Sequence, residues 1–242
     1  MLITDTPTKP NQKIAIDIVG PLTETPNGNR YLLTVQDYLT KYLTIIPLKR
    51  TLACDIANAL VNEYFFIYGT PEEILSDNGN NIAGKLITEL ERMFKIKPLR
   101  TTACRPQSNG SLERAHHTII EYLKHYVNQQ GNDWDKYVKL ANLTYNTSKH
   151  EATGFTPFEL LFGREAHLPS SIAYPQSGVT GEEYLNELRN NLHSKIGQAR
   201  ENLLRAKERT KEIYDRKIIK RTPNYQIGDM VYLINQTDYK TN

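Results

Sequence analysis

A change of hydrophobic period along the first hundred residues constrains the fold most. The strand-like runs are residues 13–20, 30–37, 42–48, 72–77 and 96–102. Apolar residues recur at helical spacing over residues 52–68, and residues 85–94 form a second helical run. Turn residues separate the first two strand-like runs, as in an antiparallel meander. Strands that alternate with helices after a meander predict a mixed α/β sheet.

The rest of the chain is predicted to be mainly helical. Helices are expected at residues 108–130, at 134–145 and at 155–163, where Pro157 can start the helix. A long charged helix is expected over 182–219. Its apolar residues from Leu185 to Ala206 repeat every 3.5 residues on average, a narrow seam of the kind used for self-association. Residues 227–234 look like the first strand of a small β module.

The charge of the chain is unevenly distributed. Residues 1–188 hold 18 Lys and Arg against 21 Asp and Glu, a net charge of −3, whereas residues 189–242 hold 12 against 6, a net charge of +6. The basic end suits a polyanion, although a solvated charged helix explains it equally well. No stretch approaches the apolar length of a membrane span, so we predict no membrane partner.

Three acidic residues are candidates for chemistry. Asp17 interrupts the apolar run 13–19, Asp77 ends a strand-like run, and Glu113 follows a small polar loop. Each also has a structural explanation: an ion pair with arginine for Asp17, turn chemistry for Asp77 and the helix dipole for Glu113. If the fold brings the three together, they can hold two divalent metals that clamp the oxygens of a phosphodiester.

The order and flanks of these acids resemble a known family. Asp17, then Ser76-Asp77-Asn-Gly79, then Arg105-Pro-Gln-Ser-Asn-Gly-Ser-Leu-Glu113-Arg114 resemble the catalytic core of retroviral-type integrases, with 35 residues between Asp77 and Glu113. The segment Thr153-Gly-Phe-Thr-Pro-Phe-Glu-Leu-Leu-Phe-Gly-Arg164 is similar to integrases of Ty3/Gypsy-type LTR retrotransposons, or of host genes derived from them.

The resemblance implies an RNase H-like fold, a five-stranded mixed sheet flanked by helices. It implies that Asp17, Asp77 and Glu113 are catalytic and bind two Mg²⁺ (or Mn²⁺) ions. It also implies two reactions, trimming of the 3′ ends of element DNA and attack of the new 3′ hydroxyl on target DNA. A nuclear location is expected with it. A homo-oligomer, either dimer or tetramer, is also expected, because concerted joining of two ends needs more than one protomer.

Contacts to DNA are expected around the loop that precedes Glu113. The candidates are Arg105, Asn109, Arg114 and His117. Cationic side chains near phosphate add an affinity that weakens with salt. The scattered Lys and Arg residues of the predicted long helix indicate backbone contact more than base recognition.

Several features depart from the family pattern. Asn78, Asn80, Ile82 and the pair His116-His117 stand where the family usually has other residues. The family's N-terminal His/Cys zinc module and the second half of its C-terminal β module are missing. We therefore expect a fragment or a truncated, domesticated copy. Two alternatives stay open, a DNA-binding or assembly protein without catalysis and a ribonuclease-H-type nuclease.

The predicted organisation has five parts. They are a lead-in (1–12), an integrase catalytic core (13–168), a linker (169–181), a basic helical region (182–221) and an incomplete C-terminal β module (222–242).

Overall fold

A five-stranded mixed sheet lies at the centre of the structure, a computed structural model that describes residues 5–76, 85–100, 110–168 and 181–219. The strands follow the order β3-β2-β1-β4-β5. Their bounds are β1 Lys13–Val19, β2 Tyr31–Asp37, β3 Leu43–Leu48, β4 Glu73–Ser76 and β5 Lys97–Arg100. The pairs β1–β2 and β2–β3 are antiparallel, whereas β1–β4 and β4–β5 are parallel. The predicted mixed sheet is confirmed.

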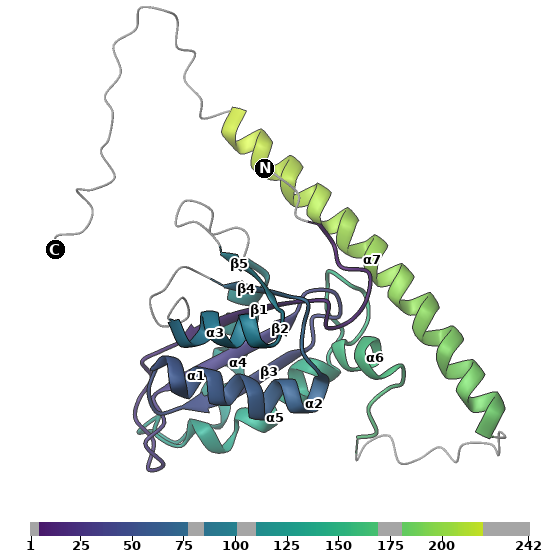
Figure 1. Ribbon diagram of the computed structural model, residues 1–242. Helices are drawn as coiled ribbons and strands as arrows, with labels where there is room; N and C mark the ends of the chain where they lie inside the picture. The colour runs from purple at the N-terminus through teal and green to yellow at the C-terminus, as the bar shows by residue number, and fades with distance from the viewer. Residues whose placement is uncertain (1–4, 77–84, 101–109, 169–180, 220–242) are drawn as a thin grey trace, which may run out of the picture. The chain divides into compact units, whose positions relative to one another are not determined.

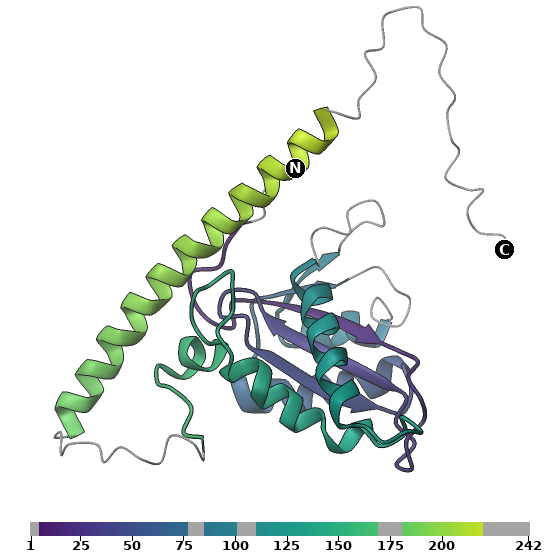
Figure 2. The same cartoon turned by 180° about the vertical axis from the view of Figure 1, so that it is seen from behind.

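Helices cover both faces of this sheet. One face carries α1 (Ala53–Leu60) and α3 (Lys85–Met93), as Figure 1 shows. The opposite face carries α4 (Gly110–Tyr126) and α5 (Val138–Thr147), which lie in front of the sheet in Figure 2. The other helical elements are η1 Val61–Phe65, α2 Phe66–Tyr68, η3 Trp134–Lys136, α6 Pro157–Phe162 and α7 Gly181–Ile219.

The alternation of side chains along β1 builds both layers of the core. Ile14 and Ile16 are fully buried in the cluster that includes α1 residues. Ala15 belongs to the cluster that includes α4 and α5 residues. Because successive side chains of a strand point to opposite faces, Asp17 lies on the same face as Ala15, beneath α4.

Two helices differ in detail from the prediction. The helix expected at 52–68 is divided by the π-helical turn η1, within which the neighbouring residues Tyr64 and Phe65 are both buried. The helix expected at 134–145 begins as the 3-10 turn η3, in which Trp134 Nε1 donates to the Thr23 carbonyl at 2.7 Å. The start of α6 at Pro157 is confirmed, and the Thr156 hydroxyl caps it by accepting from the Glu159 amide at 3.1 Å.

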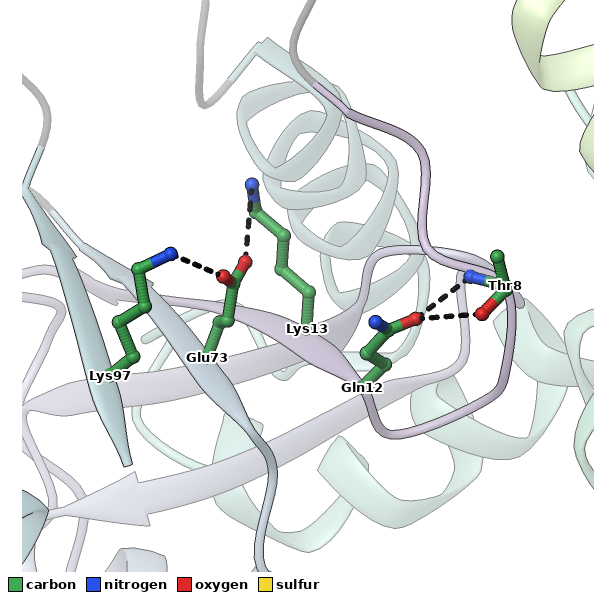
Figure 3. A network of polar contacts seen from close by, with 5 residues as sticks. All are labelled: Thr8, Gln12, Lys13, Glu73 and Lys97. Carbon is green, nitrogen blue, oxygen red and sulfur yellow. Dashed lines mark hydrogen bonds and ion pairs between the residues drawn. The ribbon is translucent and has the colours of Figure 1, made fainter. Parts of the chain in front are cut away.

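An ion-pair ladder crosses the three parallel strands (Figure 3). Glu73 of β4 lies opposite Lys13 of β1 and Lys97 of β5. Its carboxylate is 3.0 Å from Lys97 Nζ and 4.0 Å from Lys13 Nζ. Burial lowers the pKa of Lys13, and Glu73 partly offsets that effect. Just before β1, Gln12 Oε1 accepts from the Thr8 amide at 2.8 Å. The ladder lies at the N-terminal ends of β1, β4 and β5, and the opposite ends of β4 and β5 are paired through Ser76 and Arg100.

The chain forms two compact units, Thr4–Ala206 and Lys207–Asn242 with Met1–Ile3. In the first unit, α7 packs on the segment around α6. Lys195 pairs with Glu159, and Asn202 Nδ2 donates to the Thr153 carbonyl at 2.8 Å. Of the predicted seam, Ala199 and Leu203 are buried. These two seam residues thus pack within the chain and are not available for self-association.

Other expectations fall outside the described residues. The predicted linker 169–181 does so except for Gly181, and so does the predicted β module 222–242. In the second unit the described part of α7 carries an ion pair between Arg216 and Glu212 at 3.8 Å. No helix within the described ranges is both long and apolar enough to cross a membrane.

The docking of α7 yields a prediction. Leu203→Ala should destabilise the docked helix by about 2–5 kcal/mol, because it leaves a cavity at a buried leucine. Hydrogen exchange of the α7 amides and chemical denaturation measure this loss. Leu140→Ala, at a leucine of α5 that is 44% exposed, is the matched control. Equal losses for the two variants would contradict the docking.

Candidate active site

Asp17 is positioned by the centre of the sheet. It lies on β1 opposite Thr34 of β2, and its side chain is 24% exposed. Its Oδ1 accepts from the Ile18 amide at 2.8 Å, which restricts the rotation of the carboxylate. The Asp17 carboxylate thus belongs to a central strand and keeps partial access to solvent.

Glu113 is presented by the first turns of α4. The helix buries Leu112, Ala115, Ile119 and Leu123 against the sheet, so its rotation about its own axis is fixed. Glu113 itself is exposed. The residue one turn later, His116, points the same way as Glu113 because residues three apart share a helix face.

His116 shows that this helix face meets Asp17. Its Nδ1 is 3.9 Å from Asp17 Oδ2, and its Nε2 is 2.7 Å from the Thr34 hydroxyl. Burial lowers the pKa of His116 to about 4. The structure therefore brings Asp17 and the Glu113 helix together, with a neutral imidazole packed between helix and sheet at neutral pH.

The third acid, Asp77, lies outside the described residues, as do Arg105 and Asn109. Asp77 directly follows Ser76, the last residue of β4. β4 pairs in parallel with β1, with Ala15 opposite Leu75. Within the described ranges no three His, Cys, Asp or Glu side chains are grouped to hold a metal. Asp17 and Glu113 are carboxylates, the oxygen donors that Mg²⁺ and Mn²⁺ favour, so the donor set fits such ions.

Comparison with known proteins identifies the family. A family model described as "Integrase core domain" matches residues 7–108. The chain is 32% identical over 243 residues to the "Retrovirus-related Pol polyprotein from transposon 412" of Drosophila melanogaster, across 99% of this chain. The chain carries an integrase core domain. It is also 27% identical over 158 residues to the "Gypsy retrotransposon integrase-like protein 1" of Homo sapiens, across 65% of this chain. It spans 20% of the first relative and 30% of the second.

Solved integrases share the fold of this core. The chain superimposes with a TM-score of 0.53 on the magnesium-bound HTLV-2 integrase catalytic core domain, covering 63% of this chain and 97% of that one. The TM-score is 0.58 for a chain of the simian T-cell lymphotropic virus intasome, covering 73% and 61%. Both are 19% identical to this chain, which establishes the RNase H-like fold alone.

The two DNA-contact candidates on α4 are both exposed. His117 lies one turn before Glu121, whose pKa is lowered mainly by Lys124 and to a smaller extent by His117. Arg114 lies close enough to His150 for its charge to add to the effect of burial, which lowers the pKa of His150. Because Arg114 and His117 are three residues apart, the integrase core presents both on one exposed face of the helix that carries Glu113.

Sequence reasoning missed two buried polar residues of β2 beside this site. Thr34 donates to the Asp17 carbonyl at 3.0 Å. Gln36 accepts from the Ser111 hydroxyl and donates to the Tyr145 hydroxyl, both at 3.0 Å. Their spacing shows only that they share one face of the strand, because side chains two residues apart point the same way.

The partly buried His150 yields a prediction about pH. Burial, assisted by the charges of Lys41 and Arg114, lowers the pKa of His150 to about 4, and its Nδ1 accepts from the Ala152 amide at 3.2 Å. The unfolded chain binds a proton near the ordinary pKa of about 6.5, whereas the folded chain does not. The stability contributed by His150 is present above about pH 6.5 and is lost as the pH falls towards 4.

An NMR titration of the imidazole C2 proton measures the midpoint directly, and we expect about 4. Chemical denaturation should show a smaller loss of stability between pH 6.5 and 4 for His150→Gln than for the unsubstituted chain. A midpoint near 6.5 would contradict the burial of this side chain in solution.

Proposed function

We propose that this chain is the catalytic part of a retroelement integrase, which carries out 3′-end processing and strand transfer of element DNA into target DNA. One observation carries the proposal. In an integrase core fold, α4 lies over β1 so that the helix face bearing Glu113 meets Asp17, with His116 3.9 Å from the Asp17 carboxylate. Asp77 follows the neighbouring parallel strand in the chain.

The three acids share one role in the proposed reaction, which is to bind the metal ions. Asp17, Asp77 and Glu113 would hold two Mg²⁺ or Mn²⁺ ions. Bound there, such ions lower the pKa of a water or hydroxyl and neutralise charge on the phosphodiester. The chain's own part is to fix the carboxylates: the sheet holds Asp17, and the buried stripe of α4 holds Glu113. Water, and then a DNA 3′ hydroxyl, forms the new P–O bond while the opposite P–O bond breaks, so no protein nucleophile is required.

DNA is the proposed partner in two forms, element ends and target. Arg114 and His117 are exposed on the helix of Glu113, and Arg105 and Asn109 precede it in the chain. One of the structural neighbours is a chain of an intasome, which supports the proposal that this chain assembles on DNA. A homo-oligomer, dimer or tetramer, follows from the need to join two ends together. The site of action is nuclear, where chromosomal target DNA lies.

A second candidate function is DNA binding or assembly by a domesticated copy without catalysis. The observation that favours it is the substituted pair His116-His117, with the His116 ring 3.9 Å from the Asp17 carboxylate. Binding to DNA that is sensitive to salt, without any joining in Mg²⁺ or Mn²⁺, would support this function and overturn the first.

The catalytic proposal predicts loss of activity on neutralising one acid. Glu113→Gln should abolish Mg²⁺-dependent joining of short duplex DNA, because the amide no longer supplies an anionic ligand. Circular dichroism should be unchanged, since Glu113 is exposed. The matched control is Glu121→Gln, at an exposed glutamate of the same helix paired with Lys124. Full joining activity in Glu113→Gln would refute the role of this acid, whereas a loss in both variants would point to damage to α4.

The DNA contact of Arg114 predicts a change in salt dependence. Arg114→Gln should weaken duplex binding similarly for all sequences and reduce the slope of log affinity against log salt by about 1, because one phosphate contact is lost. Fluorescence anisotropy over a salt series measures both quantities. Arg92→Gln, at an exposed arginine of α3 paired with Glu89, is the control and should leave the slope unchanged. An unchanged slope in Arg114→Gln would place this residue away from DNA.

A further inference from the structure

Two buried polar side chains of β2 connect the strand of Asp17 with the helix of Glu113. Thr34 and Gln36 are each about 1% exposed. They are two residues apart, so both face α4, and they lie opposite Asp17 and Ala15 of β1. Burying polar groups costs free energy unless each is hydrogen-bonded, which directs attention to what these two bind.

Thr34 bonds to both elements with one hydroxyl. The hydroxyl donates its only hydrogen to the Asp17 carbonyl at 3.0 Å. Towards His116 Nε2, at 2.7 Å, the hydroxyl oxygen must therefore accept, so Nε2 carries a hydrogen. This order of bonds sets the imidazole orientation and leaves its Nδ1 edge facing Asp17 Oδ2 at 3.9 Å.

Gln36 makes a second connection at the start of the same helix. Its Oε1 accepts from the hydroxyl of Ser111, two residues before Glu113, and its Nε2 donates to the hydroxyl of Tyr145 in α5. Glu113 thus lies between two anchored positions of α4, Ser111 and His116. Both anchors end on the same buried face of β2, next to the strand that carries Asp17.

We propose that Thr34 is a positioning residue that holds the Glu113 helix and Asp17 in register for metal binding, with Gln36 supporting the same helix at its start. Thr34 acts through His116 and the β1 backbone and is not itself a ligand. The inference rests on the proposed function, because it concerns the metal site formed by the acids. Partners that orient metal ligands contribute about 10–100-fold to affinity or activity, which sets the expected effect.

The test compares substitutions that keep or remove the hydroxyl. Thr34→Val keeps the shape and removes both hydrogen bonds, whereas Thr34→Ser keeps the hydroxyl. In the full chain, titrated with Mn²⁺ alone, Thr34→Val should raise the dissociation constant about 10–100-fold. Thr34→Val should also lower kcat for DNA joining and leave KM for DNA unchanged. Thr34→Ser should keep most of the Mn²⁺ affinity and most of kcat.

The neighbouring strand offers a matched control. Thr44 of β3 is also buried, and its hydroxyl has no hydrogen-bond partner within the described part of the chain. Thr44→Val should leave Mn²⁺ affinity and joining unchanged. A structural effect of threonine replacement in the sheet would affect both valine variants, whereas a positioning effect is confined to Thr34.

A second pair of variants approaches the same bond from the helix and remains informative if Thr34→Val does not fold. His116→Gln keeps an N–H donor that can reach Thr34, and His116→Leu removes it. His116→Leu should weaken Mn²⁺ binding and His116→Gln should preserve more of it. NMR of the metal-free chain should show a hydrogen on His116 Nε2 in the unsubstituted protein and in Thr34→Ser.

The outcomes separate this inference from the proposed function. If the unsubstituted chain neither binds Mn²⁺ nor joins DNA, the proposed function fails and the inference fails with it. If the unsubstituted chain is active and Glu113→Gln is inactive, but Thr34→Val and His116→Leu bind Mn²⁺ as tightly as the unsubstituted chain, only the inference is overturned.

Discussion

The position of β1 in the middle of the sheet is the constraint on which the rest of the structure depends. β1 pairs antiparallel with β2 on one side and in parallel with β4 on the other. Its alternation sends Ile14 and Ile16 into one layer of the core and Ala15 into the other, which leaves Asp17 as the carboxylate beneath α4. A shift of the strand by one residue would move Asp17 into the core layer beneath α1 and move an isoleucine to the face beneath α4. Burial of the isoleucines beneath α1 therefore also determines that Asp17 faces α4.

The packing of α4 then converts this position into a site. Leu112, Ala115, Ile119 and Leu123 form a buried stripe, and Glu113 lies just beside it on the exposed surface. Apolar packing alone allows a helix to slide or rotate slightly, because it is not directional. Hydrogen bonds are directional, and those that Thr34 accepts from His116 and Gln36 accepts from Ser111 restrict both motions. Packing thus places the helix, and the polar pair sets its register on β2.

The fold could be predicted from the sequence because local signals agreed with one another. Pro157, Thr156 and Gly163 each have the chemistry expected at their positions in α6, and the predicted start of this helix is confirmed. Asp17 was recognisable as a candidate because an acid in an apolar strand needs compensation. Thr34 and Gln36 were not, since a polar residue in a strand reads equally as a solvent-facing position. Which face of β2 is covered by α4 depends on residues about 80 positions away, and no local pattern contains that information.

The same limit applies to the seam of α7. A repeat of 3.5 residues specifies an apolar stripe but not the surface that covers it. In the first unit, Ala199 and Leu203 are buried, and Lys195 and Asn202 bond to the segment from Thr153 to Glu159. The glycine at position 154 is needed there, because a Cβ would lie 3.1 Å from Asn202 Nδ2 and φ is +77°. The residues between Thr153 and Gly163 therefore have a physical role of their own: they form the surface that holds the first part of α7.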